Sequence, residues 1–273
     1  MHLVLSRIEP QDLDAIVPLM FAAFHKVDLC HVFWGRPSPA SYAYAKRKLL
    51  EGLQNDPADV FLKIEDLDAP QVDVDVLDDK GNVLRTEERN RIVCASNWKI
   101  YPTYVTPREL EEQEQKNAKA GAGSESAERK EAEAAAFSYL ETEQERIDAA
   151  VLVEDFLSRR RRECREGHVL CFILFTVQEY QGKGCGRMMM QWGNDVADSL
   201  MLPCWIEASP EGEPLYKKMG YEGRERVRIE TASFVSEYLH MRRPAMVDRV
   251  RLGEDGRTLV REKVDRETDD LDG

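Results

Sequence analysis

The sequence lacks the features that would place the chain in a membrane or in an oxidising compartment. No apolar run reaches the roughly 18 residues of a membrane-spanning helix. The N-terminus, MHLVLSRIEPQD, turns polar too early for the apolar region of a secretion signal. None of the six cysteines forms a C-x-x-C pair, so we expect free thiols rather than disulfides or a metal site. These absences predict an intracellular protein of the cytoplasm, with the nucleus as the alternative, and no membrane partner.

Positive charge is scarce as well. The chain has 38 lysines and arginines against 51 aspartates and glutamates, which gives a formal net charge of -13. A field of this sign argues against non-specific binding to nucleic acid. It mildly favours cationic partners such as amines.

The chain of 273 residues, 42% of them hydrophobic, is long enough for one core with appendages. Alternating or continuously apolar runs predict strands over residues 3–8, 60–66, 91–100, 168–177, 203–209, 227–231 and 236–244. Helical spacing predicts helices over residues 9–24, 39–54, 147–163 and 212–221, and one directly after residue 186. We therefore expect an α/β (α+β) domain over residues 1–245. Residues 246–273 are expected to form a tail or a hairpin.

Residues 102 to about 146 differ in composition from the rest of the chain. The segment PRELEEQEQKNAKAGAGSESAERKEAEAAA is charged, rich in alanine and almost free of large apolar residues. It cannot bury enough surface to offset its ordering entropy, so we expect an insertion that is disordered or a solvated helix. A lid or a partner-binding arm is the functional alternative. The arginines at 159–162 are interpreted as a charge cluster at the negative end of a helix dipole, rather than a nuclear signal or phosphate site.

The stretch QGKGCG, from Gln181 to Gly186, separates the most apolar run of the chain from an amphipathic helix. It is not a P-loop, because no Gly-Lys-Ser/Thr follows to supply a hydroxyl for magnesium. It is not a Rossmann fingerprint either, because the spacing is G-x-G-x-G. Glycines at a helix start leave backbone N–H groups open to an anion such as a pyrophosphate.

At these residues the sequence resembles the GCN5-related N-acetyltransferase family. Gln181, Gly184 and Gly186 match the family's coenzyme A signature, Q/R-x-x-G-x-G/A. The preceding apolar strand, the strand PCWIEAS and the segment LYKKMGY follow in the family's usual order and spacing. The resemblance implies a mixed, mostly antiparallel central sheet, splayed at the cofactor site and flanked by helices.

The resemblance also implies acetyl-CoA as the cosubstrate and a primary amine as the acceptor, whose identity the sequence leaves open. The pantetheine arm would pair with backbone groups of Leu174, Phe175 and Thr176, and one amide there would polarise the thioester carbonyl. The pyrophosphate would be held by Gln181, Gly182, Lys183, Gly184, Cys185, Gly186 and Arg187. Gln178 stands where many relatives carry proline.

Three residues are catalytic candidates. The resemblance implies that Tyr216 is the general acid for the departing thiolate, and a packing role is the alternative. Some relatives use a glutamate as base where this chain has Leu170. His168 leaves the same face of that strand and is one candidate base. Glu207, acting through water, is the other.

Two functions of different class follow from these residues. The first is an N-acetyltransferase in which the amine attacks acetyl-CoA directly. The second is a regulatory or scaffold module that binds acetyl-CoA without turnover. Intact loop residues and Tyr216 favour the first.

Overall fold

The computed structural model of the chain describes residues 1–103 and 137–263. Most of the predicted insertion, residues 104–136, lies outside the described residues, so its role stays a prediction. Within the described part, no helix is both long enough and apolar enough to cross a membrane. All six cysteines are free, as predicted.

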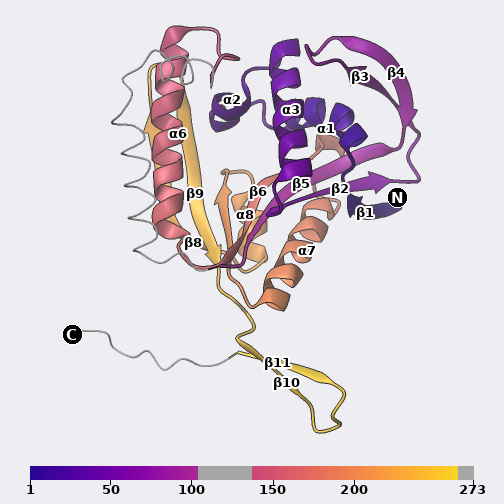
Figure 1. Cartoon of the computed structure of the whole chain (residues 1–273), viewed down its shortest axis with the longest axis vertical. Coiled ribbons are helices and arrows are strands. Elements are labelled where there is room, and N and C mark those ends of the chain that lie inside the picture. The colour runs from indigo at the N-terminus through magenta and orange to yellow at the C-terminus, as the bar shows by residue number, and fades with distance from the viewer. Residues whose placement is uncertain (104–136, 264–273) are drawn as a thin grey trace, which may run out of the picture.

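A seven-stranded mixed sheet organises the chain (Figure 1). Its strands are β1 (Leu3–Arg7), β2 (Asp59–Asp66), β5 (Arg91–Tyr101), β6 (His168–Thr176), β7 (Cys204–Ala208), β8 (Glu222–Glu230) and β9 (Val235–Arg243). They lie in the order β1-β2-β5-β6-β7-β9-β8, and every neighbouring pair is antiparallel except β6 and β7. The predicted strands and the mostly antiparallel sheet are therefore confirmed.

Helices cover both faces of this sheet. They are α1 (Leu13–Ala23), α2 (Asp28–Trp34), α3 (Pro39–Asn55), α6 (Glu143–Glu163), α7 (Cys185–Leu200) and α8 (Glu213–Lys218). The α1 and α3 helices pack on one face, and α7 and α8 pack on the other, each with its own apolar cluster. The α6 helix runs along β8 and β9 (Figure 1), and its Phe156 contacts Tyr238 on the same face as α1.

The starts of the longer helices differ in a way that bears on function. Ser38 begins α3 by accepting a hydrogen bond from the Ser41 N–H at 3.1 Å. Thr142 and Glu145 form a reciprocal capping box at the start of α6. This cap starts α6 four residues before the predicted position. By contrast, Gly184 begins α7 and no side chain caps it.

Two elements were not predicted. The short α2 helix lies between α1 and α3, and the strands β3 (Val72–Leu77) and β4 (Val83–Arg89) form a separate hairpin. That hairpin occupies the long connection between β2 and β5, which pair with each other. Of the residues expected to form a tail or a hairpin, the described ones include the paired strands β10 (Arg249–Leu252) and β11 (Leu259–Glu262), which stand apart from the sheet (Figure 1).

Candidate functional site

The parallel strands β6 and β7 separate soon after they begin to pair. Their register consists of Val169↔Cys204, Leu170↔Trp205 and Cys171↔Ile206. Beyond Cys171 and Ile206, a point that we call the fork, the two strands have no pairing with each other. Backbone N–H and C=O groups on that edge of β6 are therefore open to an added extended segment. The sheet is splayed, as predicted.

A β-bulge lies at the fork. On the β5 side of β6, Cys171 pairs with Trp98 and Ile173 pairs with Asn97, which leaves Phe172 as an extra residue. Side chains alternate between the faces of a strand, so one extra residue reverses the alternation beyond it. Ile173 and Phe175 consequently pack on the α1 face, whereas Cys171 packs on the α7 face.

The three predicted arm-binding residues all lie beyond the fork. Leu174 packs against the α7 cluster, and Phe175 is buried on the α1 face. The Thr176 carbonyl accepts a hydrogen bond from the Gln181 side chain at 3.3 Å. Strand and glycine loop are thus directly linked.

The glycine loop has the backbone shape that only glycine adopts readily. Gly182 and Gly184 have φ angles of 74° and 94°, and a Cβ built on either would meet no atom within 4 Å. The open space beside them leaves room for a ligand to approach the backbone. Tyr180 anchors the loop, because its hydroxyl donates to Asp66 at 2.9 Å.

The loop leads into the uncapped start of α7. The N–H groups in the first turn of a helix lack partners within the helix, and the helix dipole makes this end positive. Lys183 and Arg187 add exposed positive charge here, and neither has an ion pair with any residue in the described ranges. Gly186 faces α8 closely, because a Cβ there would lie 2.9 Å from Leu215. The arrangement suits a pyrophosphate.

Tyr216 lies in α8 on the α7 face of the sheet, where it belongs to the buried cluster. Burial is the main cause that raises the pKa of its phenol far above the usual value, and the thiols of Cys171 and Cys94 raise it further. The phenol therefore stays protonated at every working pH. Cys171 is the last residue of β6 before the fork, so Tyr216 lies near this point.

Glu207 is the first residue of β7 beyond the fork, and it lies on the α6 face. Arg160 of α6 donates two hydrogen bonds to its carboxylate, from Nε at 2.7 Å and from Nη2 at 2.9 Å. Arg160 also lies over the ring of Phe172 at 5.3 Å. The candidate base is thus held by a fixed positive charge.

His168 is at the paired end of β6, away from the fork. Its Nδ1–H donates to the Glu166 carbonyl at 2.7 Å, and its ring lies 5.1 Å from that of Tyr101. Burial is the main cause that lowers the pKa of this histidine. Of the two candidate bases, Glu207 is the one beside the fork.

The sequence reading missed two residues at this site. The sequence does not distinguish Arg160 from the other three arginines at the end of this helix, but in the structure Arg160 forms an ion pair with the Glu207 carboxylate. His240 pairs with Glu207 across the β7–β9 ladder, with its Nε2 3.7 Å from the carboxylate. The alternation in SEYLHMRR places His240 and Tyr238 on one face and was the signal available for the histidine.

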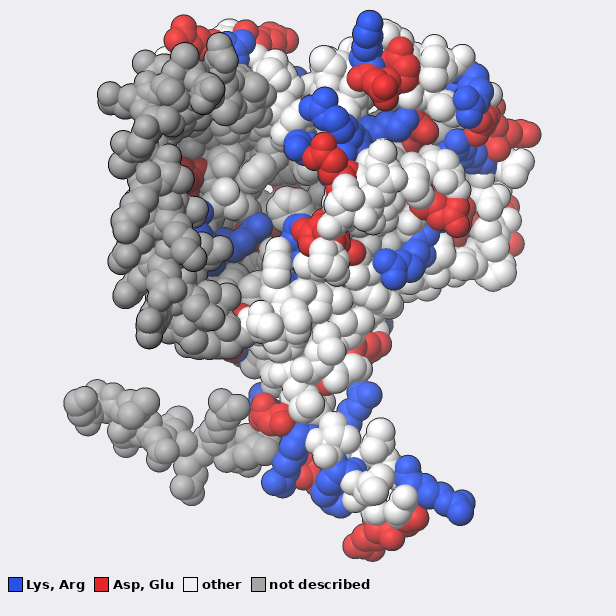
Figure 2. Space-filling model, viewed as in Figure 1, with Lys and Arg blue, Asp and Glu red and all other residues white. Residues whose placement is uncertain are grey.

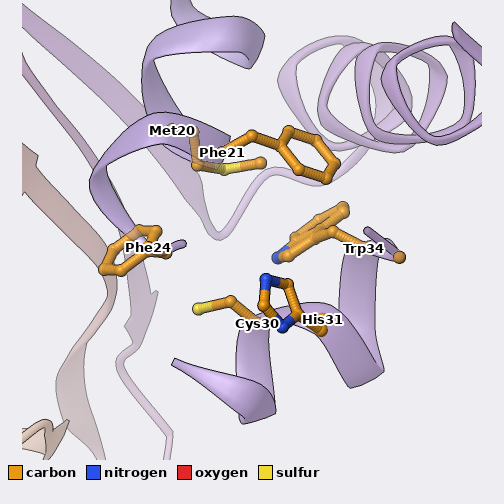
Figure 3. Close-up of a pocket in the computed structure, with 7 residues that line it drawn as sticks. Met20, Phe21, Phe24, Cys30, His31 and Trp34 are labelled. Atoms are coloured by element: carbon orange, nitrogen blue, oxygen red, sulfur yellow. The ribbon is translucent and has the colours of Figure 1, made fainter. Parts of the chain in front are cut away.

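A small apolar pocket lies between α1 and α2 (Figure 3). It is lined by Met20, Phe21, Phe24, Cys30, His31, Trp34 and Gly35. Figure 3 shows Trp34 and His31 facing Phe21 and Met20 across it. Phe24 connects the pocket to β6, because its ring lies edge-on to Phe175 at 6.1 Å.

The surface is hollowed beside this site. Figure 2 shows a depression beside the part of the molecule that carries α3, with charged side chains of both signs at its edge.

Comparisons with solved structures agree on this architecture. The arylalkylamine N-acetyltransferase 2 of Aedes aegypti is 10% identical over 90% of this chain and 100% of its own, with a TM-score of 0.52. A histone acetyltransferase HPA2-related protein of Corynebacterium glutamicum is 15% identical, over 90% of this chain and 97% of its own, with a TM-score of 0.49. A GCN5-related N-acetyltransferase of Rhodopseudomonas palustris is 11% identical, over 89% and 96%, with a TM-score of 0.45.

The chain has the fold of the GCN5-related N-acetyltransferases, as its likeness to the Aedes aegypti N-acetyltransferase indicates. No family model matches the sequence, and no curated protein does. At these identities the likeness establishes the fold alone, and function has to be argued from the site. In this N-acetyltransferase fold, the fork, the glycine loop and the start of α7 lie together.

Proposed function

We propose that the protein transfers an acetyl group from acetyl-CoA to a primary amine. The observation that carries the proposal is the unpaired edge of β6 leading into a glycine loop and an uncapped helix start. An extended polar chain can pair with the first, and a pyrophosphate can bind the second. Acetyl-CoA has both parts in one molecule, with the thioester at the far end.

The residues that bind the cosubstrate follow from this arrangement. Backbone groups of Leu174, Phe175 and Thr176 lie on the open edge of β6 and would bind the pantetheine arm. The loop residues Gln181 to Arg187 would hold the pyrophosphate through backbone N–H groups, with Lys183 and Arg187 adding charge.

Two proton transfers accompany the reaction, and this chain offers a group for each. The ammonium of the acceptor must lose a proton before its nitrogen attacks the thioester carbonyl. Collapse of the tetrahedral intermediate then breaks the C–S bond, and the thiolate gains a proton. We assign the donation of that proton to Tyr216, whose phenol stays protonated and lies near the fork. We assign the deprotonation of the incoming amine to Glu207, which lies on the opposite face.

For the acceptor we propose a primary amine that carries a compact apolar or aromatic group. Such a group suits the apolar and aromatic side chains that line the pocket between α1 and α2. The name of the similar Aedes aegypti enzyme, an arylalkylamine N-acetyltransferase, supports the same class.

Two measurements test the proposal. Calorimetric titration of the full chain should show acetyl-CoA binding, with desacetyl CoA as a comparison ligand. Release of free thiol should then be followed with phenethylamine, tryptamine, spermine and a lysine peptide as acceptors. Binding without turnover of any amine would indicate a regulatory module, and absence of binding would contradict the proposal.

A further inference from the structure

Buried polar groups gather on the α6 face of β7 and β9. Eight buried side-chain nitrogen and oxygen atoms in the described ranges have no hydrogen-bond partner. Five of them belong to this face: Trp205 Nε1, Ser236 Oγ, Tyr238 Oη, and Nδ1 and Nε2 of His240. Buried polar atoms are nearly always hydrogen-bonded, so a cluster of unpartnered ones at one place calls for a functional explanation.

The His240 ring lies at the centre of this cluster. It is 1% exposed, and its ring centroid is 5.5 Å from that of Tyr238 and 6.4 Å from that of Trp205. Its Nε2 lies 3.7 Å from the Glu207 carboxylate, which Arg160 fixes in place. The imidazole is therefore held next to a carboxylate but makes no hydrogen bond of its own.

The charges around His240 come from three neighbouring elements. Burial is the main cause that lowers its pKa; Glu207 on β7 raises it, Arg160 on α6 lowers it, and Glu163 on α6 and Glu225 on β8 raise it further. The ring is thus neutral near pH 7, and an added proton would be stabilised by the carboxylate beside it. A neutral imidazole with two free nitrogens, oriented next to a carboxylate, has the form of a general base with its supporting group.

We propose that His240, acting through Glu207, takes up the proton that the acceptor ammonium loses. This inference rests on the proposed function. The N–H bond of the ammonium breaks, the proton passes by way of the Glu207 carboxylate to a nitrogen of His240, and the nitrogen lone pair becomes free to attack. His240 becomes an imidazolium paired with Glu207 and later returns the proton to solvent. Because His240 reaches the amine only through Glu207, it is a positioning residue for proton transfer.

The geometry explains why Glu207 does not serve alone. Both carboxylate oxygens of Glu207 already accept hydrogen bonds from Arg160, whereas both ring nitrogens of His240 are without a partner, so we assign the proton to His240. His168 is excluded by position, because it lies at the paired end of β6 and its Nδ1 is committed to the Glu166 carbonyl.

The first test needs no acceptor. Histidine ring signals of the full chain are followed by NMR over pH 4.5–8.5, and the His240 signal is identified by its loss in His240→Gln. Glu207→Gln should lower the pKa of His240 further, because it removes the carboxylate that favours the imidazolium. An unchanged pKa in a folded Glu207→Gln protein would overturn the proposal.

The second test uses whichever of phenethylamine, tryptamine or spermine the wild type acetylates fastest. His240→Gln should lower kcat by about 10²-fold at pH 7.5 and move the midpoint of the acid limb away from the pKa of His240 that the NMR titration gives. His25→Gln, at an exposed histidine, is the matched control and should leave the profile unchanged.

The outcomes separate the two proposals. If His240→Gln lowers the rate but the pH–rate profile falls at the same low pH as in wild type, the role of His240 is structural. That result would overturn this inference alone. A wild type that binds acetyl-CoA but acetylates no amine would remove the proposed function, and this inference with it.

Discussion

The Trp98 indole lies directly against the backbone of Gly193. A Cβ added at Gly193 would lie 2.1 Å from Cη2 of the indole and within 2.5 Å of two more ring carbons. Trp98 is fully buried in β5, and Gly193 lies in the middle of α7. The contact therefore fixes how closely the helix that begins at the glycine loop approaches the sheet.

Gly193→Ala should destabilise the protein despite the better helix propensity of alanine. The methyl group must displace either the indole or the helix, and overpacking of this kind costs about 1–3 kcal/mol. Urea unfolding should show a lower midpoint with an unchanged slope. In the Trp98→Phe background the smaller ring leaves room, so the same substitution should cost much less there; an equal cost would contradict the contact.

The Gly184→Asp protein should bind acetyl-CoA at least about 100-fold more weakly, the equivalent of about 2.7 kcal/mol. The new carboxylate would stand at the start of α7 against the pyrophosphate, and the φ of 94° at this position disfavours any side chain. Calorimetric titration measures the effect. Gly256→Asp is the matched control, because Gly256 has a φ of 65° and an open Cβ position in the distant β10–β11 hairpin.

Tyr216→Phe should lower the rate of acetyl transfer by about 10²–10⁴-fold while acetyl-CoA affinity stays close to that of wild type. The ring and its packing remain, and only the transferable proton is lost. Tyr221→Phe serves as the control, because this neighbouring buried tyrosine donates to Asn194 at 3.2 Å on the same face. Single-turnover rates within about threefold of wild type would leave Tyr216 a packing residue.

Stability should fall as the pH drops below about 6.5, the ordinary pKa of histidine. Burial is the main cause that lowers the pKa of His31, His168 and His240, so at such pH the unfolded chain binds more protons than the folded one. The contribution of each is present above its unfolded pKa and is lost as the pH falls, with a slope of up to about 1.4 kcal/mol per pH unit. Urea midpoints at pH 7.5 and 5.5 should differ less in His168→Gln than in wild type.

The sequence predicted the fold well where periodicity and a local motif were enough. The strands, the amphipathic α7 helix and the QGKGCG loop depend on neighbours in sequence, and each lies close to where it was expected, although α7 begins inside the loop at Cys185 and β8 begins five residues early at Glu222. The β3–β4 hairpin and α2 were missed because short elements carry little periodic signal. Arg160 and Glu207 are 47 residues apart, and only the fold brings α6 across β7. A contact between residues so far apart leaves no local pattern in the sequence. The hydrogen bonds from Arg160 to the candidate base Glu207 therefore could not be predicted from the sequence.

The extra residue at Phe172 divides β6 into two stretches. Odd-numbered side chains point to opposite faces of the sheet in the two stretches. Before it, odd-numbered residues such as Val169 and Cys171 face α7; after it, Ile173 and Phe175 face α1. Deleting one residue here would turn the whole second stretch over, although no residue of the glycine loop had been touched. A sequence alignment with a relative that is shifted by one residue within HVLCFILFT would therefore match residues of the α7 face with residues of the α1 face. A substitution designed from such an alignment would be made on the wrong face of the sheet.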